Sequence, residues 1–129
     1  MTIKSGSSKK KVLHIEDDEL VVRVCSVKLG QEGIEVVRAL DGEEGLAKTV
    51  SENPDVVLLD LMLPNRDGYW YLEEVARKPD LKNIPVVVFS NLAQQTDIDR
   101  ATQLGVKDYF VKINSTIAEV VEAVKKHLG

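Results

Sequence analysis

The chain is 129 residues long, the size of one domain, and 43% of its residues are hydrophobic, which is enough for a packed core. Its 17 basic and 21 acidic residues give a net charge of -4, which argues against a nucleic-acid-binding domain. The single cysteine, Cys25, excludes a disulfide framework and a thiolate metal cluster, and no apolar run approaches the roughly 20 residues that span a bilayer. We therefore expect a cytoplasmic domain without membrane contact, most simply a monomer.

A polar N-terminus precedes five short apolar runs. Residues 1–10 carry few apolar side chains, so we expect a flexible leader before a domain over residues 11–129. The runs are rich in β-branched and aromatic residues and mostly do not alternate with polar ones, a pattern typical of strands buried on both faces of a parallel sheet. They are residues 12–15, 36–37, 56–59, 86–89 and 109–111.

The segments between these runs show the apolar spacing of helices. Leu20, Val24 and Val27 mark the first helix, and Leu46, Ala47 and Val50 mark the second. Further helices are predicted over residues 67–76, around residues 98–105, and at the C-terminus, where the last helix is capped near Ser115. Five strands alternating strictly with five helices predict a doubly wound α/β fold.

Polar residues follow the apolar runs at the points where the strands are predicted to end. In chain order they are Glu16, Asp17, Asp18, Asp60, Ser90, Asn91 and Lys112. The carboxyl ends of parallel strands meet at one edge of an open sheet, and such folds bind ligands there. We therefore expect these side chains to lie close together.

Three of the acids, Glu16, Asp17 and Asp60, would crowd like charges at this edge, and a cation would relieve the repulsion. Carboxylate oxygens suit Mg²⁺, which prefers octahedral geometry and keeps several waters. The alternative is that the acids at residues 16–19 only cap a helix and charge its first turn, with Asp18 as the cap. Both interpretations stay open at this point.

Asp60 stands alone between two apolar segments, where a merely solvated acid is not expected. A carboxylate can attack phosphorus and form an acyl phosphate. Mg²⁺, a lysine and a hydroxyl would then hold the phosphoryl oxygens, and Lys112 and Ser90 are placed for the last two tasks. The alternative for Lys112 is an ion pair with one of the acids.

The sequences HIEDD at residues 14–18 and LLDLMLP at residues 58–64, followed by Asp67 and Gly68, resemble the receiver domain of bacterial two-component response regulators. The resemblance covers about residues 11–128, and the chain looks most like stand-alone receivers such as the chemotaxis response regulator and the sporulation phosphorelay intermediate. It implies a flavodoxin-like fold, with a five-stranded parallel sheet in the order 2-1-3-4-5 and five flanking helices.

The resemblance also implies roles for individual residues. Glu16 and Asp17 match the acidic pair of the family's Mg²⁺ site, with Asp17 as a direct ligand and Glu16 acting through water. Asp60 matches the phosphoacceptor, which is also a metal ligand. The backbone carbonyl of Met62 matches a further ligand of the metal.

Three further residues match positions that contact or report the phosphoryl group. Ser90 matches the hydroxyl that hydrogen-bonds it, Lys112 matches the lysine that pairs with it, and Tyr109 falls at the aromatic switch position. The implied donor is a histidine kinase or a histidine phosphotransfer protein. The implied output passes through the fourth helix, fifth strand and fifth helix. Because the sequence ends at Gly129, we expect the output to be a separate protein or onward phosphotransfer.

The sequence departs from the family pattern around the phosphoryl site. Ile113 follows the lysine where the family usually has a proline after a cis peptide bond, so we expect either a strained cis bond or a rebuilt loop. Asn91 replaces a small residue and would either hinder access to the site or add a hydrogen bond. Met62 and Leu92 flank the site and cannot orient an attacking water, which predicts slow self-dephosphorylation.

The alternative function is a non-phosphorylated pseudo-receiver that acts as a protein-binding module, as the missing proline and Asn91 would allow. A flavin- or nucleotide-binding protein would need a Gly-rich phosphate loop where residues 16–19 are acidic. We expect no enzyme activity beyond the protein's own phosphorylation and dephosphorylation. His14 and Cys25 are expected to be core residues.

Overall fold

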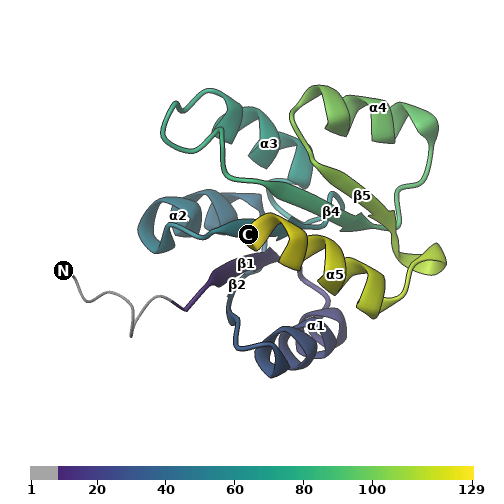
Figure 1. Cartoon of the computed structure of the whole chain (residues 1–129). Coiled ribbons are helices and arrows are strands. Elements are labelled where there is room, and N and C mark those ends of the chain that lie inside the picture. The colour runs from purple at the N-terminus through teal and green to yellow at the C-terminus, as the bar shows by residue number, and fades with distance from the viewer. Residues whose placement is uncertain (1–8) are drawn as a thin grey trace.

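Five parallel strands form the central sheet of the structure, a computed structural model that describes residues 9–129 (Figure 1). They are β1 (Lys11–Ile15), β2 (Glu35–Ala39), β3 (Val56–Leu59), β4 (Val86–Ser90) and β5 (Asp108–Val111). Their order is β2-β1-β3-β4-β5, which confirms the predicted flavodoxin-like fold, and each predicted apolar run lies within one strand. Most of the predicted leader lies outside the described residues, and Lys9 and Lys10 precede β1 without regular structure.

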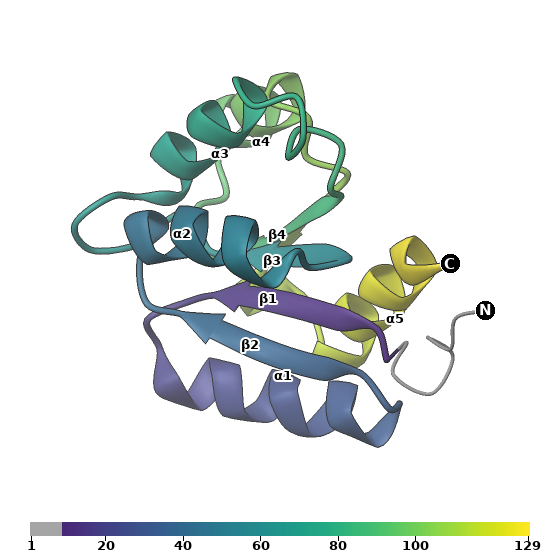
Figure 2. The same ribbon diagram turned by 90° about the vertical axis from the view of Figure 1, so that its left-hand side faces the viewer.

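Helices cover both faces of the sheet (Figure 2). In residues 9–129 the α-helices are α1 (Glu19–Gln31), α2 (Gly42–Glu52), α3 (Gly68–Ala76), α4 (Gln95–Gln103) and α5 (Ile117–Leu128). α1 and α5 pack on one face, over buried residues such as Val12 and Leu58, and the other three helices pack over Leu13 and Leu59 on the opposite face. Successive strand residues therefore point into two different cores. None of these helices has the length and apolar character needed to cross a membrane.

The buried face of α1 differs from the one that the sequence predicted. Leu20, Val24 and Val27 mark the helix correctly, but they lie toward solvent, with exposed fractions of 66%, 38% and 55%. The buried face consists of Val22 and Cys25 together with Leu29. Both sets have helical spacing, because apolar residues occur all around this helix. Packing against β2 and α5 decides between the two faces, and the sequence of α1 alone does not reveal it.

The second helix also buries a face that its large apolar residues do not mark. Val50 is 62% exposed, and the buried positions of α2 are Gly42, Gly45 and Thr49. A Cβ atom added to Gly45 would lie 2.6 Å from Cδ1 of Ile15 in β1. The helix approaches the sheet so closely that only small side chains fit between them, and Leu46 is left half-buried at the margin.

Capping residues fix the ends of the helices near the carboxyl edge of the sheet. Asp18 caps α1, and its Oδ1 accepts hydrogen bonds from the amides of Leu20 and Val21 at 3.0 and 3.3 Å. The cap of α5 is Thr116, next to Ser115 as predicted, and Thr116 and Glu119 form a reciprocal capping box. The capping interpretation of the first acidic run is therefore correct for Asp18, while Glu16 and Asp17 remain free for another role.

Candidate functional site

Three charged side chains from three different strands meet at the carboxyl edge of the sheet. Glu16 follows β1, Asp60 follows β3 and Lys112 follows β5. The ammonium group of Lys112 lies 2.9 Å from Oε1 of Glu16 and 3.0 Å from Oδ2 of Asp60. Glu16 is fully buried and Asp60 is 5% exposed. The juxtaposition expected from the strand ends is thus present, and so is the ion pair proposed as an alternative for Lys112.

Backbone amides hold the remaining carboxylate oxygens in place. Oδ1 of Asp60 accepts a hydrogen bond from the amide of Met62 at 3.0 Å, and Oε2 of Glu16 accepts one from the amide of Asp18 at 3.1 Å. Oε1 of Glu16 is buried and, apart from its ion pair with Lys112, makes no hydrogen bond of standard geometry. One carboxylate oxygen therefore retains unused acceptor capacity inside the site.

The acidic cluster fits a hard divalent cation. Carboxylate oxygens of Glu16, Asp17 and Asp60 all lie within 4.8 Å of one another, and Asp17 is exposed to solvent. The buried carboxylates of Glu16 and Asp60 and the exposed carboxylate of Asp17 form an all-oxygen donor set with an open side for water. Such a donor set matches the preferences of Mg²⁺.

Burial and charge shift the pKa values of groups around the site. Burial, reinforced by Asp60 and opposed by Lys112, raises the pKa of Glu16 to about 7. Burial lowers the pKa of Lys112, but its hydrogen bond to Glu16 and the charge of Asp60 outweigh that effect and raise it overall. His14 is buried in β1, and burial, together with the positive charges of Lys112 and Arg38, lowers its pKa to about 3.

These shifts predict opposing effects of pH on stability. Between pH 4.5 and about 7, Glu16 is protonated in the folded protein but ionised in the unfolded chain. Its contribution to the free energy of unfolding therefore falls as the pH rises through this range. His14 binds its proton only in the unfolded chain between about pH 3 and 6.5, so its contribution to stability grows as the pH rises. Each slope is at most about 1.4 kcal/mol per pH unit, and the two oppose each other between pH 4.5 and 6.5.

In Glu16→Gln only the effect of His14 remains, so the free energy of unfolding is expected to rise with pH between pH 4.5 and 6.5. In His14→Leu only the effect of Glu16 remains, so the free energy of unfolding is expected to fall over the same range. Urea unfolding at several pH values in the presence of EDTA measures both slopes. If Glu16→Gln and the wild type show the same pH profile, the raised pKa of Glu16 is wrong.

The two predicted switch residues are connected through Leu92. Ser90 is fully buried at the end of β4, and its Oγ accepts a hydrogen bond from the amide of Leu92 at 3.4 Å. The hydroxyl of Tyr109 in β5 donates to the carbonyl oxygen of Leu92 at 2.7 Å. Burial and the charges of Asp97 and Asp60 raise the pKa of Tyr109 to about 12, so the phenol stays protonated as a donor. A shift of Ser90 would move the acceptor of Tyr109.

The residues that depart from the family pattern lie around the mouth of the site. The peptide bond between Lys112 and Ile113 is trans, as are all peptide bonds in residues 9–129, and a 3₁₀ turn, η2 (Lys112–Asn114), follows β5. The rebuilt loop is thus the correct alternative. Asn91 and Met62 are exposed, and Met62 and Leu92 line an apolar hollow of about 440 Å³.

Arg38 and Gly68 also shape the site, although the sequence analysis assigned no role to either. Arg38 in β2 donates hydrogen bonds to the backbone carbonyls of Glu16 and Asp17. A Cβ atom added to Gly68 would lie 2.7 Å from the carbonyl oxygen of Asp60. The contacts of Arg38 span 22 and 21 positions of sequence, so no local pattern signals them. Gly68 belongs to the motif quoted above, but the motif does not show how closely it packs against Asp60.

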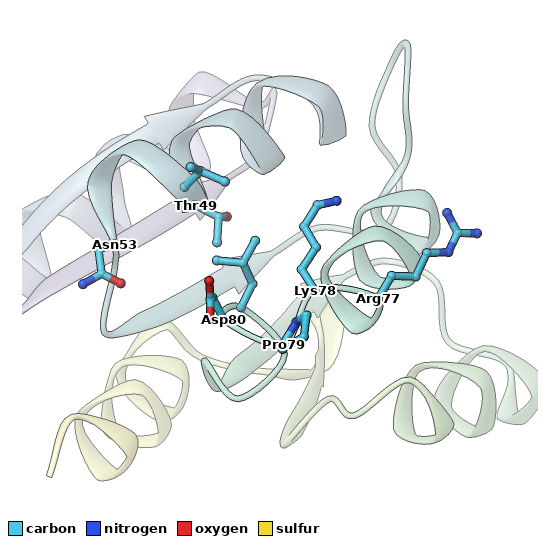
Figure 3. A pocket seen from close by; sticks show the side chains of 8 residues that line it. Thr49, Asn53, Arg77, Lys78, Pro79 and Asp80 are labelled. Carbon is cyan, nitrogen blue, oxygen red and sulfur yellow. The ribbon is translucent and has the colours of Figure 1, made fainter.

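A separate cavity of about 460 Å³ lies at the opposite end of the sheet, between the end of α2 and the segment that leads from α3 to β4 (Figure 3). Thr49 and Asn53 line it on the helix side, and Arg77 and Asp80 line it on the other side. It contains none of the residues that the sequence predicted for the site. The predicted site residues thus lie at the carboxyl edge, away from this cavity.

Comparisons with known proteins agree with this architecture. The family described as Response regulator receiver domain matches residues 12–125. The probable transcriptional regulator ycf27 of Cyanophora paradoxa is 37% identical over 105 residues, which cover 81% of this chain and 43% of that protein. The chain spans less than half the length of the curated relatives it matches.

Solved structures show the same similarity. The phosphorylated cyanobacterial phytochrome response regulator RcpA is 34% identical, with a TM-score of 0.79 and coverage of 92% of this chain and 91% of that one. The Mn²⁺-bound form of response regulator Rcp1 is 30% identical, with a TM-score of 0.77 and coverage of 91% and 90%. Together with the strand order, these matches show that the chain belongs to the response regulator receiver domain family.

Proposed function

We propose that the protein is a phosphoryl-accepting signalling switch of a two-component or phosphorelay system, with Asp60 as the phosphoacceptor. The observation that carries this proposal is the position of Asp60, which lies at the sheet edge between the ammonium of Lys112 and a cluster of acids suited to a divalent cation. The similarity to a phosphorylated regulator and to a Mn²⁺-bound one supports the same assignment.

In the proposed reaction, an oxygen of the Asp60 carboxylate attacks the phosphorus of a phosphohistidine on a histidine kinase or phosphotransfer protein. The O–P bond forms as the P–N bond breaks, and the imidazole leaves with the bonding electron pair and takes up a proton. Asp17, Asp60 and the Met62 carbonyl would hold Mg²⁺, with Glu16 acting through water. Bound there, Mg²⁺ supplies positive charge to the transferring phosphoryl oxygens.

The other residues of the site hold the product and transmit its presence. The ammonium of Lys112 pairs with a phosphoryl oxygen in place of its contact with Asp60, and the Ser90 hydroxyl donates to another. When Ser90 turns toward the phosphoryl group, it releases the Leu92 amide, and the acceptor of Tyr109 moves with it. The altered surface of α4, β5 and α5 then meets a partner protein. The protein catalyses no reaction beyond its own phosphorylation and dephosphorylation.

Two-dimensional amide NMR combined with ³¹P NMR tests this function, with phosphoramidate as a small donor that carries a P–N bond. In the presence of Mg²⁺ we expect an acyl phosphate resonance together with shifts of the amides of Ser90, Leu92 and Tyr109. Asp60→Asn is expected to show neither change. A protein that binds Mg²⁺ but shows no acyl phosphate and no shifts would contradict the proposal and favour a pseudo-receiver. The presence of all the charged groups of the site argues against that alternative.

The acyl phosphate is expected to be long-lived, on a scale of minutes or longer. Met62 and Leu92 present apolar side chains beside the phosphoryl position, so no side chain there orients an attacking water. Met62→Asn is expected to shorten the lifetime several-fold by adding a polar group. Val50→Asn, a change at a similarly exposed apolar residue of α2, serves as the control. Decay of the ³¹P signal measures the lifetime, and a wild-type lifetime of seconds would refute this prediction.

A further inference from the structure

Arg38 reaches from the edge strand β2 to the loop that carries the acidic pair. Its Nε donates to the carbonyl oxygen of Glu16 at 3.3 Å, and its Nη2 donates to the carbonyl oxygen of Asp17 at 3.1 Å. The amide of Glu16 in turn donates to the carbonyl of Ala39 at 3.0 Å. Strand β2 therefore holds this loop both through its backbone and through one side chain.

Asp17 depends on this contact more than its neighbours do. Glu16 is fixed by Lys112 and by the Asp18 amide, and Asp18 is fixed as the cap of α1. For Asp17, the bond from Arg38 is the one hydrogen bond found among the residues that the structure describes. Its carboxylate is exposed, so burial does not hold it either. The residue proposed as the direct metal ligand is thus positioned mainly from β2.

The backbone of Arg38 is itself held by α2. The ammonium of Lys48 donates to the carbonyl oxygen of Arg38 at 2.6 Å and pairs with Glu44 at 3.1 Å. Glu44 accepts a hydrogen bond from the amide of Leu40, just past β2, at 2.6 Å. A chain of contacts therefore runs from α2 through β2 to the acidic loop. Because the backbone of Arg38 is fixed by Lys48, its guanidinium can hold the acidic loop in a defined position.

We infer that Arg38 is a positioning residue that holds the backbone of Asp17, and with it the carboxylate, in place for a divalent cation. This inference rests on the proposed function. The planar guanidinium presents Nε and Nη2 as two donors at a fixed separation to the two adjacent carbonyls, whereas the N–H groups of a lysine ammonium diverge from a single nitrogen and do not reproduce this geometry. Groups that orient a metal ligand without touching the metal commonly change metal affinity by about 10-fold or more.

The sign of the effect separates positioning from simple electrostatics. A positive charge beside a cation site repels the cation, so if Arg38 acted only through its charge, Arg38→Gln would tighten Mg²⁺ binding. A positioning role predicts the opposite. Arg38→Lys keeps the charge but loses the two-donor geometry, so positioning predicts weaker binding in this variant as well.

Isothermal titration calorimetry of Mg²⁺ binding is the test, on the whole chain and with thermal unfolding as a check of the fold. We expect both Arg38→Gln and Arg38→Lys to raise the dissociation constant by about 10-fold. Arg23→Gln, which removes the same charge from an exposed position on α1, is expected to leave it unchanged. Asp17→Asn shows that the heat arises from the proposed site.

The outcomes separate the inference from the proposed function. If the wild type binds Mg²⁺ through Asp17 and the Arg38 variants bind it equally well or more tightly, the inference is overturned and the proposed function stands. If the wild type does not bind Mg²⁺ at all, both fall. If Arg38→Gln does not fold, the conservative Arg38→Lys still decides, since wild-type affinity in that variant overturns the positioning role.

Discussion

Lys112→Met is expected to lower the free energy of unfolding by about 3 kcal/mol at pH 8 without Mg²⁺. The side chain of Lys112 is 14% exposed and lies between the carboxylates of Glu16 and Asp60. Its removal leaves a fully buried acid and a nearly buried acid without a counter-charge. Leaving one partner of a buried ion pair uncompensated is among the most costly changes a side chain can make. Urea unfolding measures the loss.

Two conditions are expected to restore the stability of this variant. The folded pKa of Glu16 is already raised, and without Lys112 it rises further, so the penalty is present at high pH and disappears as the pH falls below the unfolded value of 4.5. Mg²⁺ at pH 8 restores stability through the same carboxylates. Lys125→Met, which breaks exposed pairs with Glu32 and Glu122, is the control and is expected to cost less than about 1 kcal/mol. A Lys112→Met variant as stable as the wild type at pH 8 would mean that the carboxylates are not held together as described.

Gly68→Ala is expected to destabilise the protein by about 3 kcal/mol and to slow phosphorylation on the order of 10-fold. The added Cβ would lie 2.6 Å from Cα of Leu61 and 2.7 Å from the carbonyl oxygen of Asp60. Both neighbours are backbone atoms and cannot rotate away, so the segment that carries the phosphoacceptor must shift. Chemical unfolding and the rate of acyl phosphate formation measure the two effects.

Gly30→Ala is the matched control for this substitution. Gly30 lies in α1, and an added Cβ there would meet nothing within 4 Å. Alanine favours a helix over glycine by up to about 1 kcal/mol, so this variant is expected to be as stable as the wild type or slightly more stable. If both variants lose stability equally, close packing at Gly68 is not the cause.

The strands and the meeting of the charged residues could be predicted from the pattern of the sequence, whereas the strand order is implied by the family resemblance alone. Runs such as residues 56–59 are apolar at every position, which is typical of strands covered on both faces. Once parallel strands are predicted, the residues directly after them must share one edge of the sheet. Glu16, Asp60 and Lys112 lie together for that reason.

Features that depend on how closely elements approach could not be predicted in this way. The stripe of Leu20 and Val24 has correct helical spacing but faces solvent, because a second stripe on the same helix meets the core. On α2, glycine at position 45 lies against Ile15, a close approach that hydrophobic spacing does not show. The role of Arg38 rests on a hydrogen bond across 21 positions of sequence.

Intact-mass measurement after incubation with acetyl phosphate tests the central claim most directly, with and without Mg²⁺, on the wild type and on Asp60→Asn. The proposed function predicts one phosphoryl adduct on the wild type that requires Mg²⁺ and is absent from Asp60→Asn. An adduct that persists in Asp60→Asn would place the phosphoryl group elsewhere. A wild type that binds Mg²⁺ yet acquires no adduct would contradict the assignment of Asp60 as the phosphoacceptor.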